Sequence, residues 1–458
     1  MSRVLLLKIV LLCAVAMGSI SLLPAETQYV SPSDTHPCGT FSDYLIPNPV
    51  AGNSAYPRPP LLVDLMASRY RDLLWVTAGY RLTGVPFIAH DGKKLFLVAP
   101  GDDPGLYYIV PWMSRALHLS LEASIDLFLI SALGLGFVIS FVGCMLVLGT
   151  TGARVYASLA LLCLTAIAYR VGDVYVVEFA TTVALLPWVL YVIGRDTGKY
   201  RLFQFFAFGV GLVGGIVSLI RFGSAPPVLA VLAILLLVGV QATLGKRTLL
   251  VATLLAGFLI PRLALRHVLN GGETFLQQRV AGYRQRDSRY VLGHFAYEGL
   301  GFLSNPYVPG GVCDEVAKDK VRAMAGSCVY MSSEYNRILR HEVISIARQH
   351  PALVAFTIFA KLGVVAGLIA IFANIGLLAA LRYPKSWKLE LAFWTAFAIC
   401  AAPLVLMAPL PMYCLGLISL AVMYGIVSFD HCLTTRKQCR PLLRTYHDNG
   451  VHVFVGHP

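Results

Sequence analysis

Two adjacent carboxylates, Asp102 and Asp103, have the types and spacing to do chemistry. They lie in the turn 101–105, directly before an apolar helical pattern. Neighbouring carboxylates repel each other, so one of them can keep a proton near neutral pH. A carboxylate placed in this way can accept the proton of a hydroxyl or amine nucleophile. The structural alternative is an Asp–Pro turn in which Asp103 only caps the following helix.

A short helix beginning near Pro104 is the element that would position this pair. Proline suits the first position of a helix, and apolar residues recur at helical spacing over 106–117. Tyr107, Tyr108 and Trp112 carry rings of the kind that settle at a membrane surface. The pattern predicts an interfacial helix that holds the carboxylates at the membrane boundary, with Tyr107 beside a bound substrate.

The composition is that of a membrane protein, because 57% of the 458 residues are hydrophobic and only 13% are charged. Runs of about 18 or more apolar residues recur along the chain. We therefore predict an all-α polytopic membrane protein with about ten transmembrane helices. The expected spans are 4–23, 124–148, 155–169, 174–193, 203–220, 226–244, 248–265, 352–380, 390–408 and 411–429.

The net charge of +13 does not indicate a nucleic-acid partner, because much of the basic excess lies where a membrane topology would put it. Lysine and arginine gather in the short segments of one side, which the positive-inside rule assigns to the cytoplasm. Both termini are then cytoplasmic and both long loops lie outside. We expect a multi-pass protein of the bacterial cytoplasmic (inner) membrane.

This topology divides the chain into six parts. Segment 1–23 is a first transmembrane helix or a signal anchor; a cleaved signal peptide is the alternative, but the chain lacks a clean A-x-A site. The others are outer loop 1 (24–122), transmembrane helices 2–7 (123–265), outer loop 2 (266–351), transmembrane helices 8–10 (352–429) and a solvated cytoplasmic tail (430–458).

Each outer loop is expected to contain interfacial helices. Segment 61–82 has apolar residues at helical spacing and is a second candidate surface helix in the first loop. In the second loop, Ser332 or Ser333 can cap a helix over 334–350. An amphipathic helix thus leads from each large loop directly into a transmembrane span.

This arrangement resembles the GT-C type of integral-membrane glycosyltransferase, which includes the protein mannosyltransferases and the lipid A aminoarabinose transferases. The local resemblance lies in Asp102-Asp103 followed by Tyr107, and in "SSEYNRILRHEVISIARQHP" before a late span. It implies transfer of a sugar from a polyprenyl-phosphate carrier to a glycan, lipid or protein acceptor on the outer face. It also implies a first-loop acid as catalytic base. The family's acid usually follows the first helix closely, which makes Asp43 a further candidate.

The second outer loop offers cations for a phosphate. Guanidinium groups bind phosphate oxygens bidentately, so the loop arginines could hold the leaving group, whereas a solvated charged loop is the alternative. The candidate phosphate ligands are Arg279, Arg284 and Arg286, with Arg266 and Arg289 nearby. His294 and Glu298, four residues apart, would share one helical face. Their side chains could form a local hydrogen bond, transfer a proton or bind a metal.

Charged residues inside or beside the spans are the next candidates. Lys361 lies within an expected span, where a cation must be paired or face a polar cavity, and we expect it to contact a phosphate or a carboxylate. Arg170 is expected to pair with a nearby acid such as Asp173 or Glu178. No cofactor is certain: a divalent metal remains open, and the sequence assigns no metal ligands.

Ten cysteines are present, and the outer side permits disulfides. We predict a disulfide between Cys313 and Cys328, which leaves Cys38 unpaired. The alternatives to a glycosyltransferase are a multi-span polysaccharide polymerase or ligase, a transporter or flippase, and a non-catalytic scaffold. A transporter would be expected to show inverted repeats and broken helices; the sequence shows neither, although Pro226-Pro227 and the glycine-rich run 208–215 lean that way.

Overall fold

The computed structural model describes residues 61–98, 103–194, 200–280, 292–309, 311–326, 328, 330 and 332–448. Within these residues the chain forms fourteen helices and one two-stranded antiparallel hairpin. The elements are α3 (Ala67–Thr83), β1 (Ile88–His90), β2 (Leu95–Leu97), α4 (Leu106–Ala116), α5 (Leu121–Val147), α6 (Thr151–Val171), α7 (Val176–Gly194), α8 (Tyr200–Ile220), α9 (Pro226–Val238), α10 (Leu244–Arg279), α11 (Leu292–Leu300), α12 (Asp314–Ala325), α13 (Ser333–Gln349), α14 (Pro351–Arg382), α15 (Trp387–Leu406) and α16 (Leu415–Asp448).

Eight of the described helices are long and apolar enough to cross a membrane, so the chain is an all-α, multi-pass membrane protein. They are α5, α6, α7, α8, α10, α14, α15 and the segment Leu415–Arg436 of α16. The expected span 226–244 is instead the 13-residue helix α9, which ends before Gly239. The expected span 4–23 lies outside the described residues.

Helix α10 continues well beyond the predicted end of its span at residue 265, as far as Arg279. The end of an apolar run marks where a helix becomes polar, not where it stops. Residues 266–279 are more polar than the preceding run and contain no proline, so the helix continues into the segment that the sequence analysis assigns to the second loop.

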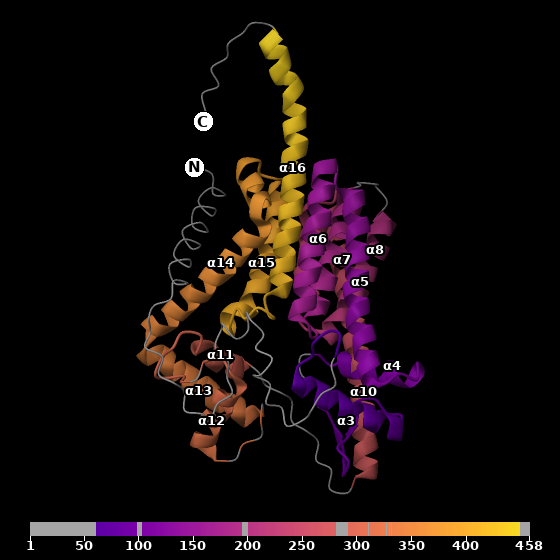
Figure 1. The fold of residues 1–458 in the computed structure, drawn as a ribbon, viewed down its shortest axis with the longest axis vertical. Coiled ribbons are helices and arrows are strands. Elements are labelled where there is room, and N and C mark those ends of the chain that lie inside the picture. The colour runs from indigo at the N-terminus through magenta and orange to yellow at the C-terminus, as the bar shows by residue number, and fades with distance from the viewer. Residues whose placement is uncertain are drawn as a thin grey trace.

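The less apolar helices α3, α4, α11, α12 and α13 gather at one end of the bundle (Figure 1). We call this the loop end and define it by α3, α4, α11, α12 and α13. The opposite end, from which α16 projects, is the tail end (Figure 1). Helix α16 packs against α6 and α7 and also against α14, so it connects the early spans with the late spans of the chain.

Helices α14 and α16 cross with their backbones in contact. A Cβ atom on Gly376 would lie 2.1 Å from the carbonyl oxygen of Gly425, so only glycine fits at this crossing. Close by, Asn374 breaks the regular path of α14 with a φ of 38°. Its Oδ1 accepts a 2.7 Å hydrogen bond from the hydroxyl of Tyr156. A broken helix, which the sequence did not reveal, is therefore part of the bundle.

The segment beginning at Asp430, expected to be a solvated tail, starts as a continuation of α16. Asp430 accepts hydrogen bonds from the backbone nitrogens of Gly149 (3.1 Å) and Thr150 (3.0 Å), and from Oγ1 of Thr150 (2.8 Å). A carboxylate is favoured there because the first turn of α6 has N–H groups without helical partners. The first residues of the predicted tail thus belong to the folded bundle.

Helix α4 begins differently from the sequence expectation. The N-cap position is Gly105 without a side-chain hydrogen bond, so Asp103 does not cap the helix. The backbone nitrogen of Gly105 instead donates to the carbonyl oxygen of Leu219 at 2.6 Å. A Cβ on Gly105 would lie 2.9 Å from the side chain of Ile220, so the chain needs glycine to approach the end of α8. This contact turns Asp103 inward.

Candidate functional site

Five buried charged side chains form a network at the loop end, which we call the arginine–carboxylate network: Arg69, Asp103, Asp173, Glu178 and Arg221. Arg69, on α3, contacts Oδ2 of Asp103 through Nε and lies 2.6 Å from Oδ2 of Asp173 through Nη1. The side chains of Arg69, Asp103 and Asp173 are 13%, 6% and 7% exposed. One guanidinium therefore joins two carboxylates that are seventy positions apart in the sequence.

A second ion pair completes the network. Nε of Arg221 lies 2.9 Å from Oε1 of Glu178, and both side chains are nearly buried. The two arginines share the ring of Tyr175, whose centroid lies 4.3 Å from Cζ of Arg221 and 5.6 Å from Cζ of Arg69. Tyr413 meets Tyr175 edge-on at 5.3 Å. Aromatic rings thus connect the two pairs and keep them from bulk water.

The turn between α6 and α7 delivers Asp173 to the network. Gly172 and Asp173 have φ values of 66° and 56°, a left-handed path that glycine and aspartate tolerate best. The backbone nitrogen of Asp173 donates to the carbonyl oxygen of Asp64 at 2.6 Å, which ties the first loop to this turn. Oδ1 of Asp173 accepts from the backbone nitrogen of Val174 at 2.6 Å. Both oxygens of Asp173 are therefore engaged.

The electrostatics keep Arg69 charged. Burial would lower the pKa of its guanidinium, but Asp173 and Asp103 outweigh burial and raise the pKa well above its ordinary value. Burial, with the charge of Asp103 next, likewise raises the pKa of the Tyr107 phenol, so Tyr107 stays neutral and can donate a hydrogen bond. With three carboxylates and two guanidiniums, the network carries a formal charge of −1 when every acid is ionised.

Asp103 and Arg69 retain hydrogen-bonding capacity that Asp173 lacks. Within the described part of the chain, Oδ1 of Asp103 accepts no hydrogen bond and Nη2 of Arg69 donates none. One proton acceptor and one planar pair of N–H donors thus remain on the same ion pair. Tyr107, whose ring is buried on α4, lies four residues after Asp103.

Only some of the predicted residues lie at the arginine–carboxylate network. Asp103 and Tyr107 lie at the network, whereas Asp43, Asp102, Arg284 and Arg286 lie outside the described residues. Arg279 is exposed at the end of α10, where its Cζ lies 5.9 Å from the ring of Phe275. The predicted pairing of Arg170 is wrong: its side chain is exposed, and Arg69 and Arg221 hold Asp173 and Glu178 instead.

A second cluster forms in the small unit made by α11, α12 and α13. His294 and Glu298 face each other on α11, with Nε2 lying 3.0 Å from Oε1. Nε2 also lies 3.4 Å from Oδ1 of Asp314, at the start of α12. Nδ1 lies 3.0 Å from the hydroxyl of Tyr335 on α13. The sequence placed His294 and Glu298 on one face, as observed, but missed Asp314.

The charges of this cluster are strongly coupled. Burial would lower the pKa of His294, but the nearby carboxylates of Asp314 and Glu298 outweigh it and raise the pKa to about 9. Burial raises the pKa of Glu298, against the opposing effect of His294. Burial would also raise the pKa of Asp314, but its bond to His294 prevails and holds the pKa at about 2.

Lys361 contacts two backbone carbonyl oxygens. Its Nζ donates to the carbonyl oxygen of Val405 at 2.9 Å and lies 3.5 Å from that of Leu406. These carbonyls end α15, and a cation is favoured at the C-terminus of a helix. The side chain is 2% exposed. No carboxylate pairs with Lys361 among the described residues, and the contact with a phosphate stays a prediction.

The predicted disulfide between Cys313 and Cys328 is not formed. Cys313 is disulfide-bonded, but Cys328 keeps a thiol, whose Sγ lies 3.6 Å from Oγ of Ser332. Ser332 also caps α13 by accepting from the backbone nitrogen of Tyr335 at 3.2 Å. Spacing alone cannot identify which of several cysteines on one side of a membrane will pair.

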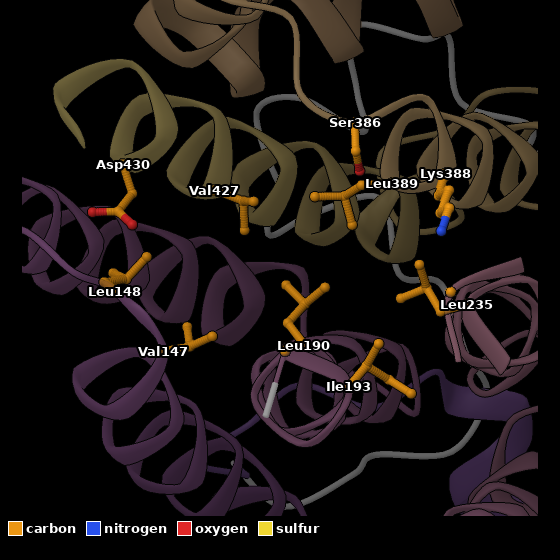
Figure 2. Close-up of a pocket in the computed structure, with 12 residues that line it drawn as sticks. Val147, Leu148, Leu190, Ile193, Leu235, Ser386, Lys388, Leu389, Val427 and Asp430 are labelled. Carbon is orange, nitrogen blue, oxygen red and sulfur yellow. The ribbon is translucent and has the colours of Figure 1, made fainter. Parts of the chain in front are cut away.

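A cavity of about 330 Å³ lies at the tail end, away from both clusters (Figure 2). Apolar side chains from α5, α7, α9 and α16 converge on it, with Asp430 and Lys388 at opposite sides (Figure 2). The surface of the cavity is mainly apolar, and its one carboxylate, Asp430, already accepts hydrogen bonds from Gly149 and Thr150.

Comparison with known proteins identifies no relative: no family model, no curated protein and no solved structure matches this chain.

Proposed function

We propose that this protein is a membrane glycosyltransferase that transfers a sugar from a polyprenyl-phosphate carrier to an acceptor at the loop end. The observation that carries the proposal is the buried arginine–carboxylate network, which combines a base and phosphate-binding groups at one end of a helix bundle. Buried charges at a membrane boundary are costly, and such residues are commonly functional. The architectural resemblance to GT-C enzymes supports the same reaction class.

Asp103 is the base in this proposal. Its Oδ1 would accept the proton of the acceptor's hydroxyl or amine while that nucleophile attacks the anomeric carbon of the sugar. The bond from this carbon to the phosphate oxygen breaks, and polyprenyl phosphate leaves with the electron pair. Arg69 holds the carboxylate of Asp103 in place through its Nε contact with Oδ2.

Arg69 and Arg221 are the groups that stabilise the phosphate. A guanidinium presents five N–H donors, and the Nη2 donors of Arg69 are the ones available to phosphate oxygens. Tyr107 is a neutral donor next to Asp103. Tyr108 and Trp112, which are 42% and 50% exposed on α4, would lie among lipid headgroups and guide the carrier to the network.

Turnover of a defined lipid-linked sugar tests the proposal. We expect purified protein in liposomes to release polyprenyl phosphate from at least one member of a panel of polyprenyl-phosphate sugars, provided that a hydroxyl- or amine-bearing acceptor is present. The product is measured by mass spectrometry of the extracted lipids. The same protein with Asp103→Asn provides the background. Absence of turnover across all common hexose, pentose and aminosugar donors would count against this function.

Transport is the second candidate, and one observation favours it. Helix α14 is broken at Asn374, and discontinuous helices are typical of transporters. A transporter would move the labelled lipid between leaflets without cleaving it. Intact lipid-linked sugar recovered from the opposite leaflet of the same liposomes, without any free polyprenyl phosphate, would favour this alternative.

A further inference from the structure

We propose that His294, Glu298 and Asp314 bind a divalent cation of the zinc class, at a site separate from the arginine–carboxylate network. Each residue offers one ligand atom, and the three atoms all lie within 4.8 Å of one another. The site is a property of the unit formed by α11, α12 and α13. It goes beyond the proposed glycosyl transfer and does not depend on it.

The distances fit a tetrahedral zinc ion. Zinc bonds to histidine nitrogen and carboxylate oxygen are about 2.0–2.2 Å, which places two tetrahedral ligand atoms roughly 3.3 Å apart. Nε2 of His294 lies 3.0 Å from Oε1 of Glu298 and 3.4 Å from Oδ1 of Asp314. Both distances from His294 are thus close to the tetrahedral spacing, and the two carboxylate oxygens lie within 4.8 Å of each other.

Glu298 provides an independent indication of a missing partner. Its side chain is 0% exposed, yet neither carboxylate oxygen receives a hydrogen bond of good geometry within the described residues; the 3.0 Å contact with His294 is an ion-pair distance only. A buried carboxylate without hydrogen bonds is strongly disfavoured. A cation bound among the three residues would supply the lacking partner.

The surroundings orient the ligands as in known metal sites. The hydroxyl oxygen of Tyr335 lies 3.0 Å from Nδ1 of His294 and can accept a hydrogen bond from the Nδ1–H group. The lone pair of Nε2 is then left for a metal. The hydroxyl of Tyr330 donates to Oδ2 of Asp314 at 3.0 Å and leaves Oδ1 for coordination. His294 and Asp314 therefore each have an outer partner that fixes the orientation needed for binding.

Charge and access also favour a divalent ion. A neutral imidazole and two carboxylates together carry a charge of −2. One divalent cation neutralises this charge, and burial disfavours an uncompensated charge. The Asp314 side chain is 55% exposed and provides a route from water. Three protein ligands leave a fourth position for a water molecule.

A cation here would join helices that have only a small core of their own. The apolar cluster of α11–α13 is separate from the main core of the bundle. Small units of this kind often rely on a metal or on disulfides for stability. Bound metal would link α11 to the start of α12, next to the disulfide-bonded Cys313.

Zinc uptake by the full-length protein tests this site. Protein purified in detergent is stripped with a chelator, and Zn²⁺ is then titrated in competition with a chromophoric chelator. We expect about one zinc ion per chain with micromolar or tighter affinity, and Co²⁺ in its place should give the visible spectrum of a tetrahedral centre. Mg²⁺ should not compete, because it prefers octahedral oxygen ligands.

Three variants distinguish this site from adventitious binding. Glu298→Gln and Asp314→Asn should each weaken zinc binding at least about tenfold. Glu315→Gln is the matched control, because Glu315 is the next residue along and pairs with Lys318 at 2.7 Å instead. Stripped wild-type protein that takes up no zinc would overturn the proposal. Unchanged affinity in both ligand variants would do the same, and gel filtration establishes that they are folded.

Discussion

Asp103→Asn should lower the turnover of polyprenyl-phosphate sugar by about 10²- to 10⁴-fold, the usual contribution of a positioned general base. Asparagine keeps the shape of the side chain and an oxygen for Arg69, but it cannot accept a proton at neutral pH. Arg69 also keeps Asp173, 2.6 Å away, so the ion pair is only partly lost. We therefore expect a folded protein with little activity, measured as polyprenyl phosphate released in liposomes.

Asp91→Asn is the matched control for this variant. Asp91 precedes Asp103 by twelve positions, and its Oδ1 accepts hydrogen bonds from the backbone nitrogens of Lys93 (2.9 Å) and Lys94 (3.0 Å). An amide oxygen can replace those bonds, so turnover should stay near the wild-type value. Full activity in Asp103→Asn would assign the proton transfer to another group and remove the catalytic role given to Asp103.

The largest expected loss of stability is that of Glu178→Ala, at about 3 kcal/mol, the lower end of the range for breaking a buried ion pair. The pair of Glu178 and Arg221 is nearly buried, with exposed fractions of 9% and 11%. Removing the carboxylate leaves a guanidinium in a poorly solvated place, beside the rings of Tyr175 and Tyr413. Thermal unfolding in detergent, followed by loss of the monodisperse gel-filtration peak, measures the effect.

Asp72→Asn provides the comparison, because Asp72 and Arg71 form an exposed pair at 3.3 Å with exposed fractions of 32% and 39%. An exposed pair contributes about 0–1 kcal/mol. The midpoint of unfolding should thus shift far less than for Glu178→Ala. Equal shifts in the two variants would mean that Arg221 remains well solvated and that the network is not buried in the protein as it exists in detergent.

Much of the fold could be predicted because hydropathy reports directly on spans. The observed α5, α6, α14 and α15 lie close to the segments expected from apolar runs. The cap at Ser332 was also predictable, because a serine before an amphipathic pattern is a local signal. Two other features could not be predicted from hydropathy. Helix α10 continues as a polar helix beyond its apolar run, and α14 is broken at Asn374, where one apolar span was expected.

The network itself was only partly predictable for the same reason. The sequence indicates Asp103, Asp173 and Glu178 as candidates, but it does not indicate Arg69 or Arg221 as their partners. Their partners lie 34, 104 and 43 positions away in sequence. Spacing at three or four residues finds partners on one helix, as it did for His294 and Glu298. It cannot find Asp314, which joins them only after α11 and α12 pack together.

The location of the carrier phosphate is the most direct test of the proposed site. A polyprenyl phosphate with a photoreactive group near the phosphate is incorporated with the protein into liposomes and irradiated, and the labelled peptides are identified by mass spectrometry. We expect labels on α3 and α4, close to Arg69 and Tyr107, and their loss when unlabelled carrier is added. Labels confined to the tail-end cavity around Lys388, or no competed label, would contradict the assignment of the arginine–carboxylate network as the site of sugar transfer.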